Sequence, residues 1–326
     1  MRIVITGGAG FLGSRLARAL LARGTLSDAR GDAQPVTEIV LLDVVAARGF
    51  DDPRVRVIAG DIADRSVVDE ALAPDTASVF HLAAVVSGQA EAEFDTGMRV
   101  NLDATRHLLE RCRQLRAPPK FVFASSIAVF GGVLPDPVPD DAALTPQSSY
   151  GTQKAIGELL VNDLSRKGMI DGRSLRLPTI TVRPGRPNKA ASSFASGIIR
   201  EPLAGERAPC PVSPQTRMWV SSPRTAIDNL VVGHEAPAAA FAATRSISVP
   251  GISVSVGDMA AALRRVAGDA VADRIDWRHD PAVDRLVSTW PAAFTAALGR
   301  SLGMRADRDF DAIVAAYIED SRPAAT

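Results

Sequence analysis

Short apolar runs alternate with stretches of helical periodicity along the first half of the chain. The runs cover residues 2–6, 38–43, 55–58, 79–82 and 120–124. Each is four to six residues long, which is typical of buried strands. After the first run, Leu12, Leu16 and Leu20 recur at the spacing of a helix. Strands that alternate with helices favour βαβ units, so we predict an α/β fold with a parallel sheet.

A glycine-rich turn follows the first predicted strand. Gly7, Gly10 and Gly13 stand between this strand and the helix, in the segment TGGAGFLG. Glycines at such a turn let the backbone approach a pyrophosphate, and the helix N-terminus adds N–H donors and a positive dipole end. We therefore predict that Gly7, Gly10, Phe11, Leu12 and Gly13 bind a dinucleotide. The GxxGxxG spacing departs from the common GxGxxG, and a plain tight turn is the alternative.

An acidic residue, Asp43, ends the second predicted strand, in the segment TEIVLLD. A carboxylate here accepts a hydrogen bond from the adenosine ribose 2′-hydroxyl and repels a 2′-phosphate, so NAD is favoured over NADP. Asp43 lies thirty residues after Gly13, farther than the usual distance of about 20. The stretch 24–35 contains Gly, Asp and Pro, and we predict that it is an inserted loop that accounts for the excess. A helix N-cap or a loop acid is the alternative for Asp43.

Three further strand ends fit one cofactor cleft. In an open parallel sheet, ligands bind at the carboxyl ends of the strands. Asp61 and Ile62 follow the third predicted strand, where they are expected to flank the adenine. The segment that ends the fourth strand contains two alanines, which allow a ribose or phosphate to lie close to the backbone. The fifth strand ends in two serines. These residues are Leu82, Ala83, Ala84, Ser125 and Ser126.

The segment SSYGTQK places Tyr150 four residues before Lys154, so on a helix both side chains lie on one face. An ammonium group there lowers the phenol's pKa from its ordinary value of about 10 and makes the phenolate a usable base near neutral pH. The chain contains only two tyrosines. The pattern YxxxK is weak when taken alone, and an ordinary helix pair is the alternative to a proton-transfer pair.

Six segments occur in one order along the N-terminal half: TGGAGFLG, GDIAD, HLAA, RVNLDATRHLL, FASSIAVFG and YGTQK. Together they resemble the extended short-chain dehydrogenase/reductase family, which is the NAD-dependent epimerase/dehydratase family. The resemblance implies that Ser126 hydrogen-bonds the substrate oxygen, that Tyr150 exchanges the proton, and that Lys154 binds the nicotinamide ribose. The further cofactor neighbours that it implies are Asn101, Ser125, Tyr150, Lys154 and Pro178.

The same resemblance implies a Rossmann-type doubly wound parallel sheet of seven strands with a smaller C-terminal substrate-binding domain. Residues 1–173 are predicted to form the NAD-binding domain, with a returning part near 215–247. Residues 174–326 are predicted to form mainly the substrate-binding domain. Within it we expect a strand over 174–180 and a helix over 193–205.

The substrate is indicated by segments that differ from those of nucleotide-sugar enzymes. Such enzymes usually carry an asparagine after the sixth strand, and Thr179 stands in its place here. RLPTI, RMWVSSPRTAID and Ser87 resemble the small-acid branch of the family. This branch contains L-threonine 3-dehydrogenases and enzymes that act on D-erythronate. The long loop before the second strand and the run RLPTITVRPG favour the latter. Their resemblance implies oxidation of the C2 hydroxyl of this four-carbon sugar acid to 2-dehydro-D-erythronate with NAD. The expected substrate contacts are Ser87, Ser126, Tyr150, Thr179, Arg183 and Arg217.

A hydroxy acid needs a cation for its carboxylate, and arginine can pair with both oxygens. Arg183 and Arg217 are the two candidates, and a surface or interdomain ion pair is the alternative for each. Other functions also remain open: an L-threonine 3-dehydrogenase, a nucleotide-sugar 4-epimerase, or a non-enzymatic NAD(H)-binding regulator. Regulators on this fold often lack the tyrosine or the lysine, and both are present here.

The composition restricts the partners. The 37 Asp and Glu balance 37 Lys and Arg, so nothing indicates a nucleic acid or an anionic membrane. The apolar run APAAAFAA is far too short to span a bilayer. Cys112 and Cys210 form no CxxC pair, so we expect reduced thiols and a cytoplasmic protein. The four histidines share no ligand spacing, so no metal site is expected. The resemblance implies a homodimer, through helices over 101–116 and 149–165.

Overall fold

The computed structural model describes residues 1–185, 190–241 and 243–322, and it divides the chain into two compact units. The first unit comprises Met1–Val129, Pro146–Arg176 and Ile227–Ile247. The second comprises Phe130–Thr145, Leu177–Ala226 and Ser248–Thr326. The part of the chain that returns to the first unit is shorter than the predicted 215–247, because the strand that begins at Arg217 belongs to the second unit.

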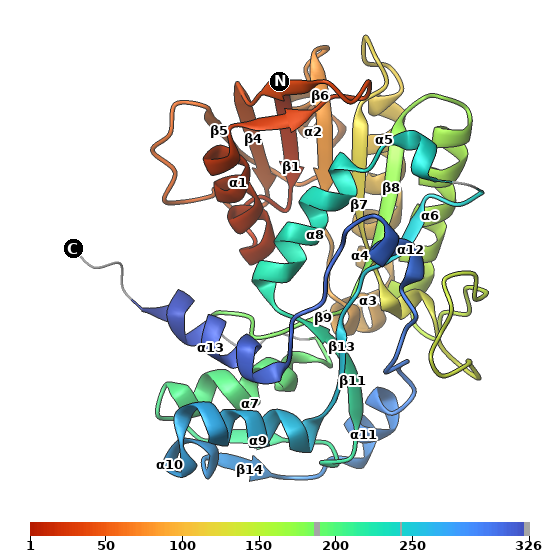
Figure 1. Cartoon of the computed structure of the whole chain (residues 1–326). Coiled ribbons are helices and arrows are strands. Elements are labelled where there is room, and N and C mark those ends of the chain that lie inside the picture. Colours follow the sequence, from red (N-terminus) through yellow and green to blue (C-terminus); the bar gives the residue numbers. More distant parts are fainter. Residues whose placement is uncertain (186–189, 242, 323–326) are drawn as a thin grey trace. The chain divides into compact units, whose positions relative to one another are not determined.

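The first unit is built on a doubly wound sheet. Within the described residues the sheet has seven strands in the order β12-β8-β7-β6-β1-β4-β5 (Figure 1). These strands are β1 (Arg2–Thr6), β4 (Glu38–Asp43), β5 (Val55–Ala59), β6 (Thr76–His81), β7 (Lys120–Ser126), β8 (Asp171–Leu177) and β12 (Ser246–Ser248). β1 pairs in parallel with β4 and β6, β4 with β5, and β6 with β7. The order reverses between β1 and β6, where such sheets bind ligands. The predicted α/β fold is confirmed.

The predicted strands 2–6 and 38–43 coincide with β1 and β4, whose central residues are buried. The prediction of a loop over 24–35 is wrong. This stretch forms an antiparallel hairpin of β2 (Thr25–Ser27) and β3 (Ala33–Pro35). Lys120 of β7 donates a 2.7 Å hydrogen bond to the hydroxyl of Ser27 in β2, and this bond connects the hairpin to the sheet. Strands this short and polar carry no apolar run, so the sequence pattern did not reveal them.

The strand predicted over 174–180 is interrupted. β8 ends at Leu177, and β9 (Thr179–Ile180) pairs instead with β11 (Arg217–Ser221) of the second unit. Pro178 lies between the two strands, and a proline has no N–H to continue a ladder.

The helices of the first unit carry most of the predicted site. They are α1 (Phe11–Arg23), α2 (Arg65–Ala71), α3 (Ser87–Ala92), α4 (Phe94–Gly97), α5 (Ala104–Cys112), α6 (Ser149–Arg166) and most of α8 (Pro223–Glu235). A π-helical segment, η1 (Met98–Asp103), leads into α5, and single 3-10 turns form η2 (Ile127–Val129) and η3 (Ala238–Ala240). π-helical segments occur frequently at functional sites, and η1 contains Asn101.

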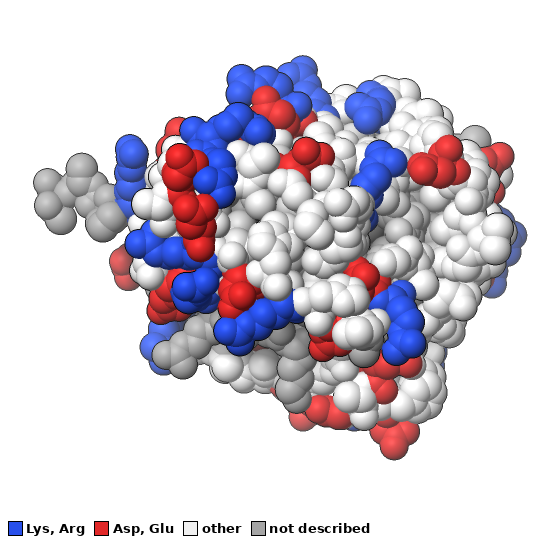
Figure 2. All heavy atoms as spheres, turned by 90° about the horizontal axis from the view of Figure 1, so that it is seen from below, with Lys and Arg blue, Asp and Glu red and all other residues white. Residues whose placement is uncertain are grey.

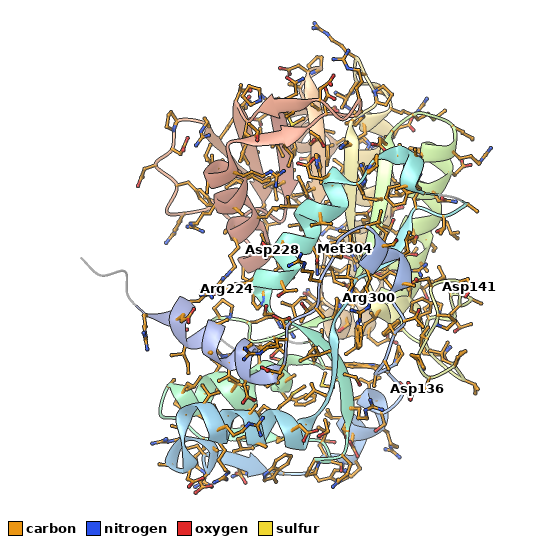
Figure 3. The ribbon with its side chains drawn as sticks, viewed as in Figure 1. Asp136, Asp141, Arg224, Asp228, Arg300 and Met304 are labelled. Atoms are coloured by element: carbon orange, nitrogen blue, oxygen red, sulfur yellow. The ribbon has the colours of Figure 1, made fainter. Side chains whose placement is uncertain are left out.

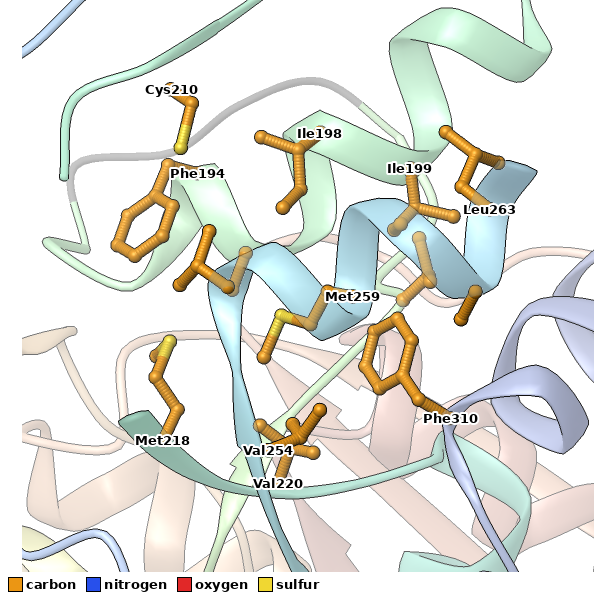
Figure 4. Close-up of a cluster of buried hydrophobic side chains, with 14 of the residues drawn as sticks. Phe194, Ile198, Ile199, Cys210, Met218, Val220, Val254, Met259, Leu263 and Phe310 are labelled. Carbon is orange, nitrogen blue, oxygen red and sulfur yellow. The ribbon is translucent and has the colours of Figure 1, made fainter. Parts of the chain in front are cut away.

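The second unit has a hydrophobic core of its own. Its elements are β9, β11, α7 (Ser193–Leu203), β10 (Ala208–Cys210), β13 (Ile252–Ser255), α9 (Val256–Ala267), α10 (Asp269–Ala272), β14 (Ile275–Trp277), α11 (Pro281–Val287), α12 (Ala297–Ser301) and α13 (Phe310–Ser321). Ile198 and Ile199 of α7, Met259 and Leu263 of α9, and Phe310 of α13 pack together in this core (Figure 4). The predicted helix over 193–205 matches α7.

The surface charges are mixed in sign. On the face drawn in Figure 2, basic and acidic side chains are interspersed with uncharged ones, in keeping with a net charge of zero. Among the residues that the structure describes, no helix combines the length and the apolar character that crossing a membrane requires.

Candidate active site

The glycine turn between β1 and α1 is closely packed against its neighbours. Gly7 has a φ of 71°, and a Cβ there would lie 2.9 Å from the backbone nitrogen of Ala83. A Cβ at Gly13 would overlap the carbonyl oxygen of Gly7. Side chains at these two positions would therefore push the turn away from β6 and away from the helix.

The N-terminus of α1 suits an anionic group. Its first residues are Phe11 and Leu12, and its N-cap is Gly10, which has no side chain to cap the helix. The first N–H groups of a helix have no partner inside the helix, and they carry the positive end of its dipole. The turn thus offers donors without side-chain obstruction, which fits the pyrophosphate of a dinucleotide.

Asp43 ends β4 beside this turn. Its Oδ2 accepts a 3.0 Å hydrogen bond from the backbone N–H of Ala9, and the residue is half-buried. The contact orients the carboxylate at the edge of the glycine turn. Its contact with the adenosine ribose remains a prediction.

The other predicted cofactor residues lie at the carboxyl ends of β5 and β6. Asp61 forms a 2.6 Å ion pair with Arg99 of η1 and accepts a 2.9 Å hydrogen bond from the Ala63 N–H. Ile62 is buried in the core of the first unit, and its contact with the adenine remains a prediction. The residues that directly follow β6 are half-buried. They are Leu82, Ala83 and Ala84.

A chain of hydrogen bonds joins the end of β1 to η1 through His81, a residue that sequence reasoning did not assign to the site. The Ala83 N–H lies 3.2 Å from Thr6 Oγ1, and Thr6 Oγ1 lies 2.7 Å from His81 Nδ1. His81 Nε2 is 2.8 Å from Thr105 Oγ1, which donates to the carbonyl of Asn101. Because Thr105 uses its proton on that carbonyl, His81 must donate from Nε2. Burial, with a contribution from the Lys154 charge, lowers the pKa of His81 to about 3.

Asn101 is buried and holds the loop after β6. Its Oδ1 accepts from the Val85 N–H at 2.9 Å, and its Nδ2 donates to Gln153 Oε1 at 2.8 Å. Gln153 precedes Lys154 on α6. Asn101 therefore connects the loop after β6 with the helix that carries Tyr150 and Lys154, and its assignment as a cofactor neighbour remains a prediction.

Ser126 and Tyr150 come from two elements that approach each other closely. Ser126 ends β7, and its Oγ accepts a 3.1 Å hydrogen bond from the Ala128 N–H. A Cβ at Gly151, the residue after Tyr150, would overlap the carbonyl oxygen of Ala128. Only a glycine at this position lets α6 approach η2 so closely. Both Ser126 and Tyr150 are half-buried, so each keeps an accessible face.

Lys154 is buried below Tyr150. Its ammonium donates a 2.8 Å hydrogen bond to the carbonyl of Ala124 and lies 5.6 Å from the ring centroid of Tyr150 and 4.7 Å from that of Phe123. Burial lowers the pKa of Lys154 to about 7, and the carboxylate of Glu158 acts in the opposite direction. The structure thus brings Ser126, Tyr150 and Lys154 into one region of the first unit.

A buried ion pair beneath this region was missed in the sequence. Glu158 accepts hydrogen bonds from Arg176 at 2.8–3.1 Å and from the Ser125 hydroxyl at 2.6 Å. Ser125 therefore uses its hydroxyl within the protein, and its assignment as a cofactor neighbour remains a prediction. The spacing Tyr150, Lys154, Glu158 continues the four-residue period of one helix face, which was the available signal.

The predicted substrate residues are divided between the two units. Ser87 begins α3 in the first unit. Thr179 lies in β9 of the second unit, after the buried Pro178. Arg183 donates to the Ser192 hydroxyl at 2.9 Å, and its N–H donates to Ser196 at 3.0 Å.

Arg217 is the more exposed candidate for a carboxylate clamp. Its side chain is 53% exposed and donates to the Ser253 hydroxyl at 2.8 Å. Its guanidinium also lies 4.0 Å from Asp136, which is labelled in Figure 3. Arg224, labelled in the same figure, is bound by Glu319 and Asp320 of α13.

The model of the family described as "NAD dependent epimerase/dehydratase family" matches residues 3–222 of the chain. A D-erythronate dehydrogenase of Cupriavidus necator is 58% identical over 323 residues, which are 98% of this chain and 99% of the relative. A D-erythronate dehydrogenase of Haemophilus influenzae is 43% identical over 98% of this chain and 99% of the relative. A solved structure described as the nucleoside-diphosphate-sugar epimerase from Agrobacterium tumefaciens is 41% identical, with a TM-score of 0.92 over 98% of this chain and 94% of that one.

Proposed function

The chain belongs to the NAD dependent epimerase/dehydratase family, and from this we propose that it oxidises the C2 hydroxyl of D-erythronate to 2-dehydro-D-erythronate with NAD. The observation that carries the proposal is the 58% identity, over nearly the full length of both chains, with a protein named D-erythronate dehydrogenase. The grouping of Ser126, Tyr150 and Lys154 supports it, because such a group suits proton exchange with an alcohol.

The chemistry that we propose places each residue in one role. The Tyr150 phenolate accepts the proton of the C2 hydroxyl, and Ser126 hydrogen-bonds the oxygen as it becomes a ketone oxygen. The Lys154 ammonium favours the charged phenolate. Bound NAD supplies the acceptor for the hydride that leaves C2. The glycine turn and Asp43 hold the cofactor in position, which is the main task of the protein in such reactions.

A second candidate function is that of a nucleotide-sugar epimerase. It is favoured by the printed name of the Agrobacterium tumefaciens structure, which resembles this chain over nearly its whole length. Against it stands Thr179, which occupies the place of the asparagine that such enzymes usually use.

A substrate panel distinguishes the two functions. The purified protein is incubated with NAD and, separately, D-erythronate, its stereoisomer L-erythronate, L-threonine and UDP-sugars. We expect NADH absorbance at 340 nm with D-erythronate and a 2-dehydro product in mass spectrometry. Epimerised UDP-sugar without net NADH formation, together with no reaction on any acid, would favour the epimerase.

We predict a preference for NAD over NADP that depends on Asp43. In Asp43→Ser, the ratio of kcat/KM for the two cofactors should fall by about tenfold or more, because the carboxylate no longer repels a 2′-phosphate or accepts from a 2′-hydroxyl. Asp51→Ser, at an exposed acid of the same unit, is the matched control and should leave the ratio unchanged. Equal kcat/KM for both cofactors in the wild-type protein would reject the assignment.

We predict that an arginine of the second unit binds the substrate carboxylate. Arg183→Met or Arg217→Met should raise KM for D-erythronate about tenfold or more and leave the affinity for NAD unchanged, since a charged hydrogen bond contributes about 1.5–3 kcal/mol. Arg224→Met is the control, because Arg224 is already engaged by α13. If Arg183→Met and Arg217→Met both leave kcat/KM unaltered, other groups hold the carboxylate, with Ser87 and Ser126 the next to test.

For assembly we propose the homodimer that the family resemblance implies, and for location the cytoplasm, on the basis of the two cysteines that form no CxxC pair. Leu159, on α6, is 63% exposed, and a dimer formed by this helix would cover it. Light scattering of the wild type and of Leu159→Glu, which should weaken a dimer formed by this helix, tests the assembly.

A further inference from the structure

We propose that Glu158, held by Arg176 and Ser125, is a positioning residue. It keeps Lys154 in its charged form and thereby favours the phenolate of Tyr150, the form that accepts the proton. The inference deepens the proposed function and rests on it only for the role of Tyr150. Its evidence is the arrangement of buried charges on one face of α6.

Glu158 lies four residues after Lys154, so both side chains project from the same face of α6. Both are buried, with 2% of each residue exposed. A buried carboxylate is stable only when it is paired and hydrogen-bonded. Arg176, on β8, meets this need with contacts at 2.8–3.1 Å, and the Ser125 hydroxyl adds a third donor at 2.6 Å.

Two successive residues at the end of β7 contact this group, and Ser126 follows them in the strand. The carbonyl of Ala124 accepts from the Lys154 ammonium, the hydroxyl of Ser125 donates to Glu158, and Ser126 is the proposed substrate contact. β7 and α6 are thus joined by two buried polar contacts next to the proposed site. A Cβ at Gly157 would lie 2.7 Å from the Phe123 ring, so the helix is also close to the strand here.

Among the residues that the structure describes, titratable and charged groups near Lys154 come from three elements. α6 supplies Tyr150 and Glu158, β6 supplies His81, and β8 supplies Arg176 through its pair with Glu158. His81 is neutral near physiological pH because its pKa is lowered to about 3. Glu158 is therefore the anionic group among these four at neutral pH before Tyr150 ionises.

Burial alone moves the Lys154 ammonium toward its neutral form, and its pKa falls to about 7 even with Glu158 present. Without the carboxylate, Lys154 would be mostly neutral at pH 7, and the phenolate of Tyr150 would lose its neighbouring cation. Arg176 fixes where the carboxylate lies, and its own positive charge limits the effect on Lys154. Glu158 therefore favours the charged form of Lys154, and Arg176 disfavours it.

The chain has only four lysines, which makes the charge of Lys154 directly measurable. In protein labelled with [6-¹³C]lysine and free of cofactor, NMR shows one Cε signal per lysine, and the Lys154 signal is assigned by its loss in Lys154→Arg. We expect the midpoint of its titration to be about one pH unit lower in Glu158→Gln. It should be higher in Arg176→Gln, which removes the counter-charge, and nearly unchanged in Ser125→Ala.

A merely structural role would not give shifts of opposite sign, so equal midpoints in the wild type and Glu158→Gln, or shifts of the same sign in both variants, overturn the inference. If Glu158→Gln does not fold because the buried Arg176 loses the Glu158 carboxylate, the comparison is made between Arg176→Gln and the double variant Glu158→Gln/Arg176→Gln. The double variant must then show the lower midpoint, and equal midpoints overturn the inference. These titrations need no substrate, so their failure is separate from failure of the D-erythronate assay.

Discussion

Replacement of Tyr150 by Phe is expected to lower kcat for D-erythronate by about 10²–10⁴-fold, the usual cost of losing a general base. The change removes one hydroxyl and leaves the ring, so the packing of α6 against η2 is kept. Lys154 keeps its hydrogen bond to Ala124. The affinity for NAD, measured by calorimetry, should therefore remain within a few-fold of the wild type.

The chain offers a matched control for this change. Its one other tyrosine is Tyr317, on α13 of the second unit. Tyr317→Phe removes the same atom from the same residue type, and we expect wild-type turnover. A Tyr150→Phe variant that keeps more than about a tenth of wild-type kcat would show that another group takes the proton.

Gly151→Ala is expected to lower kcat about 10²-fold without changing any reacting group. The new methyl group would overlap the carbonyl oxygen of Ala128, so the start of α6 must move away from η2. This movement separates Tyr150 from Ser126, and a displacement of about 1 Å at a reacting group costs about two orders of magnitude. Binding of NAD should weaken little, because the glycine turn after β1 is untouched.

The control for this prediction is Gly197→Ala, in the middle of α7. A Cβ there would meet only the flexible end of Glu201, at 3.5 Å, so no backbone has to move. We expect unchanged kcat and, from the better helix propensity of alanine, equal or higher thermal stability. Wild-type kcat in Gly151→Ala would mean that the close approach of α6 to η2 is not needed for turnover.

The central part of the fold could be predicted because it depends on local patterns. Apolar runs mark β1 and β4 to the residue, and the glycines of the turn after β1 are required by backbone contacts that the structure shows. The hairpin of β2 and β3 carries no such pattern. Leu26 of β2 is buried, but it is the one large apolar residue of the stretch 24–35, and a period cannot be read from one residue.

The proposed site could be predicted in part for the same reason. Tyr150 and Lys154 are four residues apart on one helix, so their proximity follows from helix geometry. The pair of Glu158 and Arg176 depends on how β8 lies beside α6, and eighteen residues separate the two in sequence. The link through His81 joins residues of β1, β6 and α5, which only the folded sheet brings together. Contacts of this kind have no periodic signal.

The measurement that tests the proposed function most directly follows the hydrogen on C2 of the substrate. D-erythronate carrying deuterium at C2 is incubated with NAD and the protein, and both products are analysed by mass spectrometry and NMR. We predict that deuterium appears at nicotinamide C4 of the reduced cofactor and that the acid is recovered as unlabelled 2-dehydro-D-erythronate. Deuterium that stays on the acid while NADH forms would place the oxidation at another carbon, and no NADH from D-erythronate would contradict the function.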